Sequence, residues 1–197
     1  MTIKPTTIEG DRLRLEPIGP AYLDALAEFG VNPDLWRYRP DSVSTREQMQ
    51  SYIQRILDRQ EEGTELGFVI VERASNRVAG STRFMDIDVP NRGVEIGGTF
   101  IAPQWQRTFV NTETKYVMLR HAFETWGCIR VCLKTDSLNE RSRQAILRLG
   151  AKEEGTLRNH MIMSGGRVRH SVYYSILDTE WPAVKAGLEA KLRRTAP

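Results

Sequence analysis

The chain of 197 residues has no long apolar run, and none exceeds the length of Phe68–Val71. A membrane-spanning helix needs about 20 apolar residues, so we predict none. The N-terminal residues lack the apolar segment of a secretory signal, and internal repeats and low-complexity linkers are missing. With 40% hydrophobic residues, the sequence therefore predicts one soluble, cytoplasmic domain spanning residues 1–197.

Cysteine and histidine are also scarce. Cys128 and Cys132 lie four residues apart in a β-branched stretch. That spacing places both on one face of a strand, too far apart to form a disulfide, so we predict buried, reduced thiols. His121, His160 and His170 fall on different predicted elements. We therefore predict no metal site.

The charge has no strong sign. The sequence holds 28 basic and 25 acidic residues, a net charge of +3. The basic residues are interspersed with acids and form no run, so the charge does not by itself argue for nucleic acid, and we predict neither a nucleic-acid nor a membrane partner. The sequence does not determine the oligomeric state, and a homodimer is one possibility.

The first half of the chain predicts a strand and two helices. Residues 12–17 alternate polar and apolar, which indicates a half-buried strand. Residues 20–29 follow with proline at a helix entry and Gly30 at the end. A capping box, Ser44–Glu47, begins a second helix that ends at Gly63.

The loop between these helices, residues 32–42, contains Trp36 and Tyr38. Aromatic side chains in a loop either pack onto the core as a lid or form the wall of a substrate site. Both interpretations stay open, and we take Trp36 and Tyr38 as candidate substrate-binding residues.

Three successive runs, 65–72, 78–88 and 93–101, predict antiparallel strands joined by short turns. The chain then alternates between helix and strand. We expect a helix capped by Asn111 and closed by Gly127, a strand at 129–134, a helix begun by the capping box Ser137–Glu140, a hairpin turning at Gly165–Gly166, and a last helix to about Arg194. This order predicts a mixed α/β domain.

The loop at residues 104–111 runs from a strand into a helix. Such a loop presents unpaired backbone N–H groups and the positive end of the helix dipole, which together favour a phosphate. Many such loops bind nothing, so this signal alone is weak.

The order of elements and several motifs resemble the GNAT acetyltransferases, in particular the branch of the ribosomal-protein N-acetyltransferases of the RimJ/RimL type. The motifs include Arg12–Glu16, Glu95–Gly97, Asn111–Glu113, Asn139–Ser142 and Leu149–Ala151. The resemblance implies a mostly antiparallel sheet splayed at its centre with helices on both faces, and transfer of acetyl from acetyl-coenzyme A to an amine. The cofactor contacts that it implies are Phe100, Ile101, Gln106, Arg107, Thr108, Phe109, Val110, Asn111, Thr112, Asn139 and Ser142.

The loop departs from the family pattern, because Arg107 and Phe109 stand where the family has glycines. Glycines allow backbone N–H groups to approach phosphate and tolerate a positive φ. A bulky residue at positive φ costs about 1–3 kcal/mol. Arg107 either offsets part of this loss by charge-assisted hydrogen bonds to phosphate or is a solvated surface arginine.

The chemistry requires a base, an oxyanion donor and a donor for the leaving sulfur. Glu95 is our candidate base. The alternative is that Glu95 only faces outward from its strand and has no catalytic role. Backbone N–H groups at 99–101 are candidates for holding the oxyanion. The resemblance implies that Asn139 binds pantetheine and that Ser142 protonates the leaving sulfur. The alternative for both is capping of a helix.

Two functions therefore stand. The first is an acetyl-coenzyme A dependent N-acetyltransferase that acts on a protein N-terminus or a small amine by direct attack on the thioester. The second is a GNAT-shaped binding module in which Arg107 and Phe109 impair cofactor binding.

Overall fold

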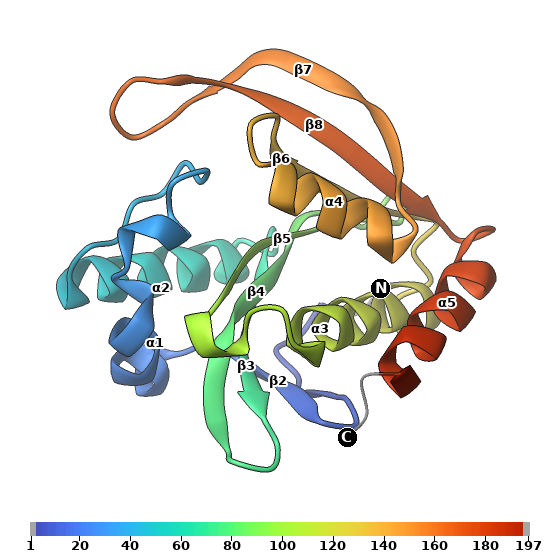
Figure 1. Ribbon diagram of the computed structural model, residues 1–197, viewed down its shortest axis with the longest axis horizontal. Helices are drawn as coiled ribbons and strands as arrows, with labels where there is room; N and C mark the ends of the chain where they lie inside the picture. Colours follow the sequence, from blue (N-terminus) through green and yellow to red (C-terminus); the bar gives the residue numbers. More distant parts are fainter. Residues whose placement is uncertain (1–2, 195–197) are drawn as a thin grey trace.

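The computed structural model describes residues 3–194, which form an eight-stranded sheet in the order β1-β2-β3-β4-β5-β6-β8-β7 (Figure 1). Only β5 and β6 run parallel; the other neighbours are antiparallel. The strands are β1 (Ile8–Glu9), β2 (Leu13–Pro17), β3 (Leu66–Glu72), β4 (Arg77–Asp88), β5 (Gly93–Ile101), β6 (Arg130–Asp136), β7 (Lys152–Ile162) and β8 (Val168–Leu177). The predicted mixed α/β fold is confirmed.

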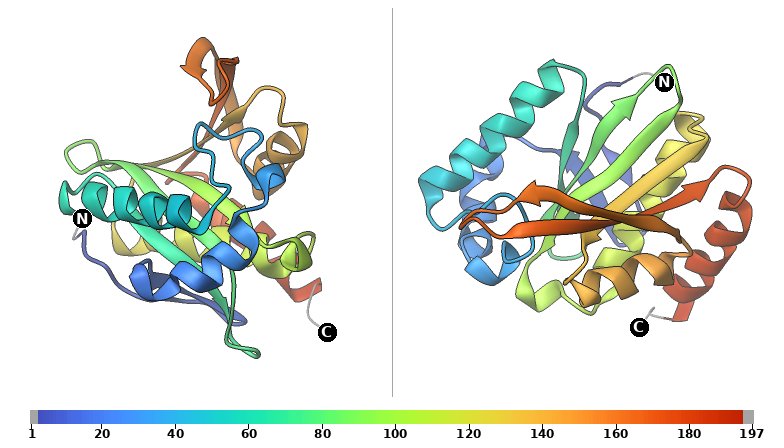
Figure 2. Two further views of the ribbon diagram at one scale, coloured as in Figure 1. Left: turned by 90° about the vertical axis from the view of Figure 1, so that its left-hand side faces the viewer. Right: turned by 90° about the horizontal axis from the view of Figure 1, so that it is seen from above.

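Helices cover both faces of the sheet. One apolar cluster joins α1 (Leu23–Gly30) and α2 (Arg46–Glu61) to one face, and a second joins α3 (Phe109–Arg120) and α5 (Trp181–Arg194) to the other. Figure 2 shows the α1–α2 pair and α5 on opposite sides of the sheet. The remaining helical segments are η1 (Pro20–Tyr22), η2 (Pro33–Leu35), η3 (Pro103–Trp105), the π-helical η4 (His121–Thr125) and α4 (Glu140–Leu149).

Local sequence patterns explain these elements. Every residue of β3 is buried, because helices pack on both faces of this strand. On α2 the buried residues Met49, Tyr52, Ile53 and Ile56 recur with helical spacing and face the sheet, as the sequence predicts.

The sheet opens at its centre. The pairing between β5 and β6 covers only Gly93–Glu95 against Arg130–Cys132. Beyond Glu95 the two strands diverge, so the edge of β5 is free of a strand partner there. The expected splay is confirmed, and it creates the cleft that the next section describes.

The helix caps differ from the prediction at three places. Thr45, not Ser44, caps α2. Thr108, not Asn111, caps α3, and Asn139, not Ser137, caps α4. Candidate cap residues cluster in each of these segments, and the course of the backbone decides which side chain reaches an unpaired N–H.

The hairpin of β7 and β8 arches over the rest of the domain (Figure 1). It turns at Gly165 and Gly166, whose φ values of 92° and 83° confirm the turn predicted there. Arg169 on β8 donates to the backbone oxygen of Tyr38 at 3.3 Å. The hairpin therefore contacts the loop between α1 and α2.

Candidate functional site

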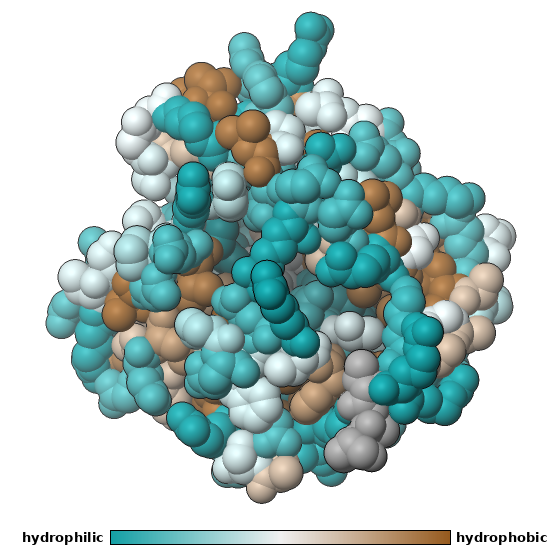
Figure 3. Space-filling model, viewed as in Figure 1, coloured by the Kyte–Doolittle hydropathy of each residue, from teal (hydrophilic) through white to brown (hydrophobic). Residues whose placement is uncertain are grey.

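A cleft of about 450 Å³ lies where β5 and β6 diverge. Its walls come from the loop after α1, the end of β5, the entry of α3, β6 and α4. Figure 3 shows the corresponding face, hollowed between α4 and the α1–α2 side and surrounded by hydrophilic side chains. Of the expected cofactor residues, the cleft is lined by Phe100, Ile101, Gln106, Arg107, Thr108, Asn111, Thr112, Asn139 and Ser142.

A β-bulge shapes the strand that borders this cleft. The register of β5 against β4 shifts between Gly97 and Phe100, and Gly98 has φ 58°. At Gly97 a Cβ atom would lie 2.8 Å from Glu95 Oε1 and from Met85 Sδ, so a larger residue would displace the ends of these two side chains. The bulge turns the end of β5 away from β6 and leaves its backbone facing the cleft.

In the loop before α3, only Arg107 adopts the backbone conformation for which the family pattern has glycine. Arg107 has φ 62°, the left-handed conformation that glycine usually supplies. The Thr108 side chain then accepts from the Val110 N–H and caps the helix. The loop therefore keeps the course that a glycine would allow, at a conformational cost.

Phe109 and Val110 were expected to contact the cofactor, and the structure corrects this. Phe109 is the first residue of α3, so it does not need a positive φ. Its ring lies 4.0 Å from the Arg12 guanidinium, and neither side chain lines the cleft. Val110 is fully buried in the core, and its N–H is already bound to Thr108. Phe109 therefore does not block the cleft.

The mouth of the cleft is positively charged. Arg107, Arg141 and Arg148 line it and are exposed. Arg141 donates to Gln106 Oε1 at 2.9 Å, and the Gln106 amide donates to the Ile101 carbonyl at 2.9 Å. These guanidinium groups suit a ligand that carries several phosphates.

The entry of α4 holds Asn139 and Ser142. Asn139 Oδ1 accepts from the Ser142 N–H at 3.1 Å, which is an N-cap hydrogen bond. Both residues also line the cleft. The capping role is therefore present in the structure, and the Ser142 hydroxyl has no hydrogen bond to another described residue.

Glu95 does not itself line the cleft, but its partner Lys134 does. Glu95 is buried, with 3% of its surface exposed, and its carboxylate pairs with Lys134 Nζ at 2.8 Å. Burial raises the pKa of the Glu95 carboxyl, and the Lys134 ammonium opposes that shift. Lys134 lines the cleft and also contacts the exposed Asp86 at 3.4 Å. The outward-facing alternative for Glu95 is wrong.

The loop aromatics divide between two roles. Trp36 is 3% exposed, donates its indole N–H to the Gly30 carbonyl at 2.6 Å and packs against Tyr52 and Phe100. It is a core residue outside the cleft lining, so the expectation of a substrate contact is corrected. Tyr38 does line the cleft, beside Arg39, whose guanidinium donates to the Thr99 carbonyl at 3.1 Å.

Lys115 is a cleft residue that was not predicted from the sequence. It is buried on α3, lines the cleft and donates to Thr99 Oγ1 at 2.6 Å. Burial lowers the pKa of its amine from 10.5 to about 7, while Glu95 raises that pKa and Arg39 lowers it. The sequence offered one indication of this position: Lys115 lies four residues after Asn111, which places both on one face of the helix.

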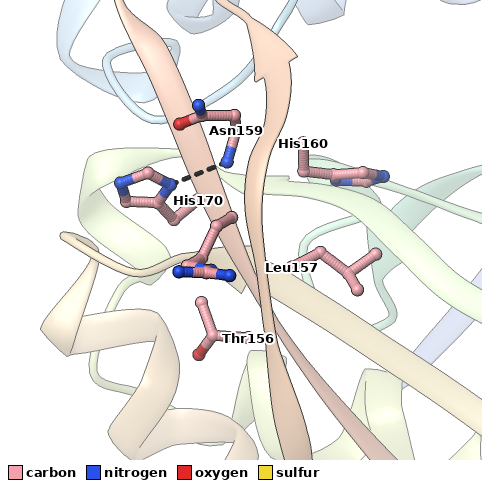
Figure 4. Close-up of a pocket in the computed structure, with 6 residues that line it drawn as sticks. Thr156, Leu157, Asn159, His160 and His170 are labelled. Carbon is pink, nitrogen blue, oxygen red and sulfur yellow. Dashed lines mark hydrogen bonds between the residues drawn. The ribbon is translucent and has the colours of Figure 1, made fainter.

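A second hollow is lined by residues of the β7–β8 hairpin (Figure 4). It is larger, at about 870 Å³, but most of its lining residues are exposed. His160 and His170 lie on opposite sides of the hairpin in Figure 4, and His170 accepts from the Asn159 N–H at 2.9 Å. The two imidazoles therefore do not form a joint site there.

Residues 3–194 contain no cluster of three or more histidine, cysteine or acidic side chains that could hold a metal ion. No helix in this range is long and apolar enough to cross a membrane. Cys128 and Cys132 are free thiols, and burial raises the pKa of each to about 11. Neither is therefore an activated nucleophile.

The splayed sheet, the bulge at the cleft and the positively charged helix entry define an acyltransferase fold, and sequence comparison agrees. Residues 12–152 match the model of the acetyltransferase (GNAT) domain, so the chain belongs to the GNAT acetyltransferase family. Membership of this family implies acetyl-coenzyme A as the co-substrate.

Three relatives illustrate the match. The uncharacterized N-acetyltransferase YoaA of Bacillus subtilis is 26% identical over 84% of this chain and 94% of its own. YdaF of the same organism, provisionally named a ribosomal N-acetyltransferase, is 32% identical over 55% of this chain and 58% of its own. A GCN5-related N-acetyltransferase structure from Brucella melitensis superimposes with a TM-score of 0.88 at 29% identity, covering 98% of this chain and 87% of that one.

Proposed function

We propose that this protein transfers the acetyl group of acetyl-coenzyme A to a primary amine by direct attack on the thioester. The observation that carries the proposal is the cleft itself, which has exposed arginines at its mouth and, deeper in, Lys134, which pairs with the buried carboxylate of Glu95. The co-substrate, when bound, supplies the acetyl group and a thiol as leaving group.

The residues of the cleft fit that co-substrate. Arg107, Arg141 and Arg148 suit its phosphates, and the end of the free edge of β5 offers backbone groups to an extended pantetheine chain. The N–H groups at 99–101 are candidates for stabilising negative charge on the thioester oxygen.

Two side chains handle the protons in this proposal. Glu95 takes the proton that the acceptor ammonium must lose before it attacks, directly or through one water. Ser142 donates a hydrogen bond to the leaving sulfur, since its hydroxyl lies in the cleft lining. Tyr38 and Arg39 line the acceptor side.

The finer proposal is that the acceptor is a protein N-terminus, as in the RimJ/RimL-type branch, and that the enzyme acts in the cytoplasm. YdaF, with its ribosomal name, supports a protein acceptor, and a small amine is the competing acceptor. A homodimer stays part of the proposal, to be tested by sedimentation.

The alternative function is a binding module with impaired cofactor binding. It rested on Arg107 and Phe109, but Phe109 packs away from the cleft and Arg107 adopts the conformation of the missing glycine. Both observations favour the enzyme.

Calorimetric titration with acetyl-coenzyme A, together with thermal unfolding in its presence, tests the choice. At 100 times its dissociation constant the ligand should stabilise the protein by about 2.7 kcal/mol. Arg107→Ala should weaken binding and flatten its salt dependence, whereas the control Arg158→Ala, at an exposed position of β7 outside the cleft lining, should change neither. No binding by the parent protein at millimolar ligand would favour the module. A panel of N-terminal peptides and small amines then identifies the acceptor.

A further inference from the structure

Lys115 is a cation without an ion-pair partner. Its surface is 7% exposed, and among residues 3–194 no carboxylate forms a salt bridge with it. Its amine donates to the hydroxyl of Thr99 at 2.6 Å. The nearest acidic influence is Glu95, whose carboxylate is already paired with Lys134.

An ammonium in such a place destabilises the folded protein. Burial without a counter-ion disfavours the charged form, and a methionine would fill similar space without that cost. A buried titratable group with a perturbed charge state, lying in a cleft, is a candidate functional group. Here the burial and the position in the cleft are both direct observations.

Lys115 approaches the bulge of β5 from the side of α3. Ile96 packs into the apolar cluster that contains α3. Glu95 alternates with Ile96 along β5, so it lies on the other face, where its carboxylate pairs with Lys134. The two groups therefore act from opposite faces of β5. The hydroxyl that holds Lys115 belongs to Thr99, in the segment whose backbone borders the cleft.

We propose that Lys115 is a further catalytic residue, whose ammonium stabilises the negative charge that acetyl transfer develops on the thioester. This inference rests on the proposed acetyl transfer. In that step the acceptor nitrogen forms a bond to the carbonyl carbon and the carbon–sulfur bond breaks. The electron pair moves first to the carbonyl oxygen and then to the sulfur. The acceptor ammonium gives its first proton to Glu95 before the attack, and the second proton, which the nitrogen loses as the amide forms, reaches the sulfur through Ser142, so that a thiol leaves.

A titration of bound coenzyme A tests the inference without any acceptor. A cation beside the sulfur favours the thiolate. Because Lys115 is an ammonium only below about pH 7, the bound thiol should already ionise near that pH in the parent protein, whereas in Lys115→Met it should ionise only near the ordinary thiol pKa of about 8.5. We expect a difference of about one pH unit or more, measured by the ultraviolet absorbance of the thiolate. Lys152→Met, on the exposed strand β7, is the control and should match the parent.

The variant Lys115→Arg tests whether the positive charge at position 115, and not the shape of the lysine side chain, is what matters. A guanidinium stays protonated throughout the usual pH range. Lys115→Arg should therefore keep the lowered thiol ionisation, and Lys115→Met should lose about 10²-fold in kcat with less than a threefold change in affinity for acetyl-coenzyme A. The ratio of parent to Lys115→Arg activity should fall as pH rises through about 7, since only lysine loses its proton there.

Each outcome decides the matter. Equal thiol ionisation in the parent and in Lys115→Met overturns the role of Lys115 while leaving the proposed acetyl transfer intact. A large loss of affinity without a change in thiol ionisation shows a role in binding only and also overturns it. If the parent protein binds no coenzyme A, the proposed function and this inference both fail.

Discussion

The charged side chains at the mouth of the cleft and those away from it differ in their surroundings. At the mouth, Arg107, Arg141 and Arg148 are exposed to solvent. Away from the mouth, Lys115 in the cleft lining and Glu95, which pairs with the lining residue Lys134, are buried and have altered pKa values. Exposed charges are screened by salt and hydrated, so each contributes modestly to affinity. Buried charges interact strongly, and a change there alters the chemistry or the stability.

The largest expected effect concerns Glu95. Glu95→Gln keeps the shape and removes the basicity, so turnover should fall by about 10²–10³ and the acidic limb of the pH–rate profile should disappear. In the parent, activity should rise with pH through the raised pKa of Glu95, as the carboxyl loses its proton. Steady-state kinetics between pH 4 and 9 would show this.

Asp86→Asn is the matched control, because Asp86 contacts the same Lys134 at 3.4 Å from an exposed position. It should leave turnover within a factor of about three. Normal turnover and an unchanged profile in Glu95→Gln would mean that solvent or another group is the base.

The next effect concerns the contribution of Lys115 to stability. The folded protein lowers the pKa of Lys115 to about 7 from 10.5. Between these values the unfolded chain binds the additional proton, so Lys115 makes the free energy of unfolding rise with pH by up to about 1.4 kcal/mol per pH unit. Below the folded value the penalty is fully present. Lys115→Met should remove this slope and stabilise the protein near neutral pH, measured by urea unfolding at several pH values.

Lys152→Met should retain the slope of the parent. Identical slopes in the parent and in Lys115→Met would show that the Lys115 amine is hydrated in the folded protein, and the contrast between the exposed and the buried charges would be lost.

At the mouth, the two residues in the glycine positions should respond in opposite ways. Phe109→Gly removes a partly buried ring that contacts Arg12 and weakens the first turn of α3, so it should destabilise the protein by about 2 kcal/mol. Arg107→Gly relieves the positive φ and should stabilise it by up to about 1 kcal/mol, while weakening acetyl-coenzyme A. Thermal unfolding and calorimetric titration measure the two effects. Tighter cofactor binding by Phe109→Gly would restore the idea of a blocked loop.

The smallest effects belong to the entry of α4. Asn139→Ala should lower stability by about 1 kcal/mol, because the capping hydrogen bond to the Ser142 N–H is lost. Ser142→Ala should change stability by less than about 0.5 kcal/mol and mainly lower turnover. Equal losses of stability for both variants would make Ser142 a structural residue.

Much of the fold was predictable from local patterns. The alternation in residues 12–17, the helical spacing of Met49 to Ile56 and the paired glycines of the last hairpin each record a local preference of the backbone. These patterns hold wherever an element packs, because they express only which side of a strand or helix is apolar.

The sequence by itself determined the order of the elements, their family and the segment that enters the cleft. Only the tertiary structure decided which side chains face it. Trp36 and Phe109 pack inward and Lys115 lines the cleft, although helical and loop patterns alone do not distinguish a core position from a cleft position. The distinction arises where β5 and β6 separate, since the divergence of two strands far apart in sequence leaves one side of α3 over open space instead of over the core.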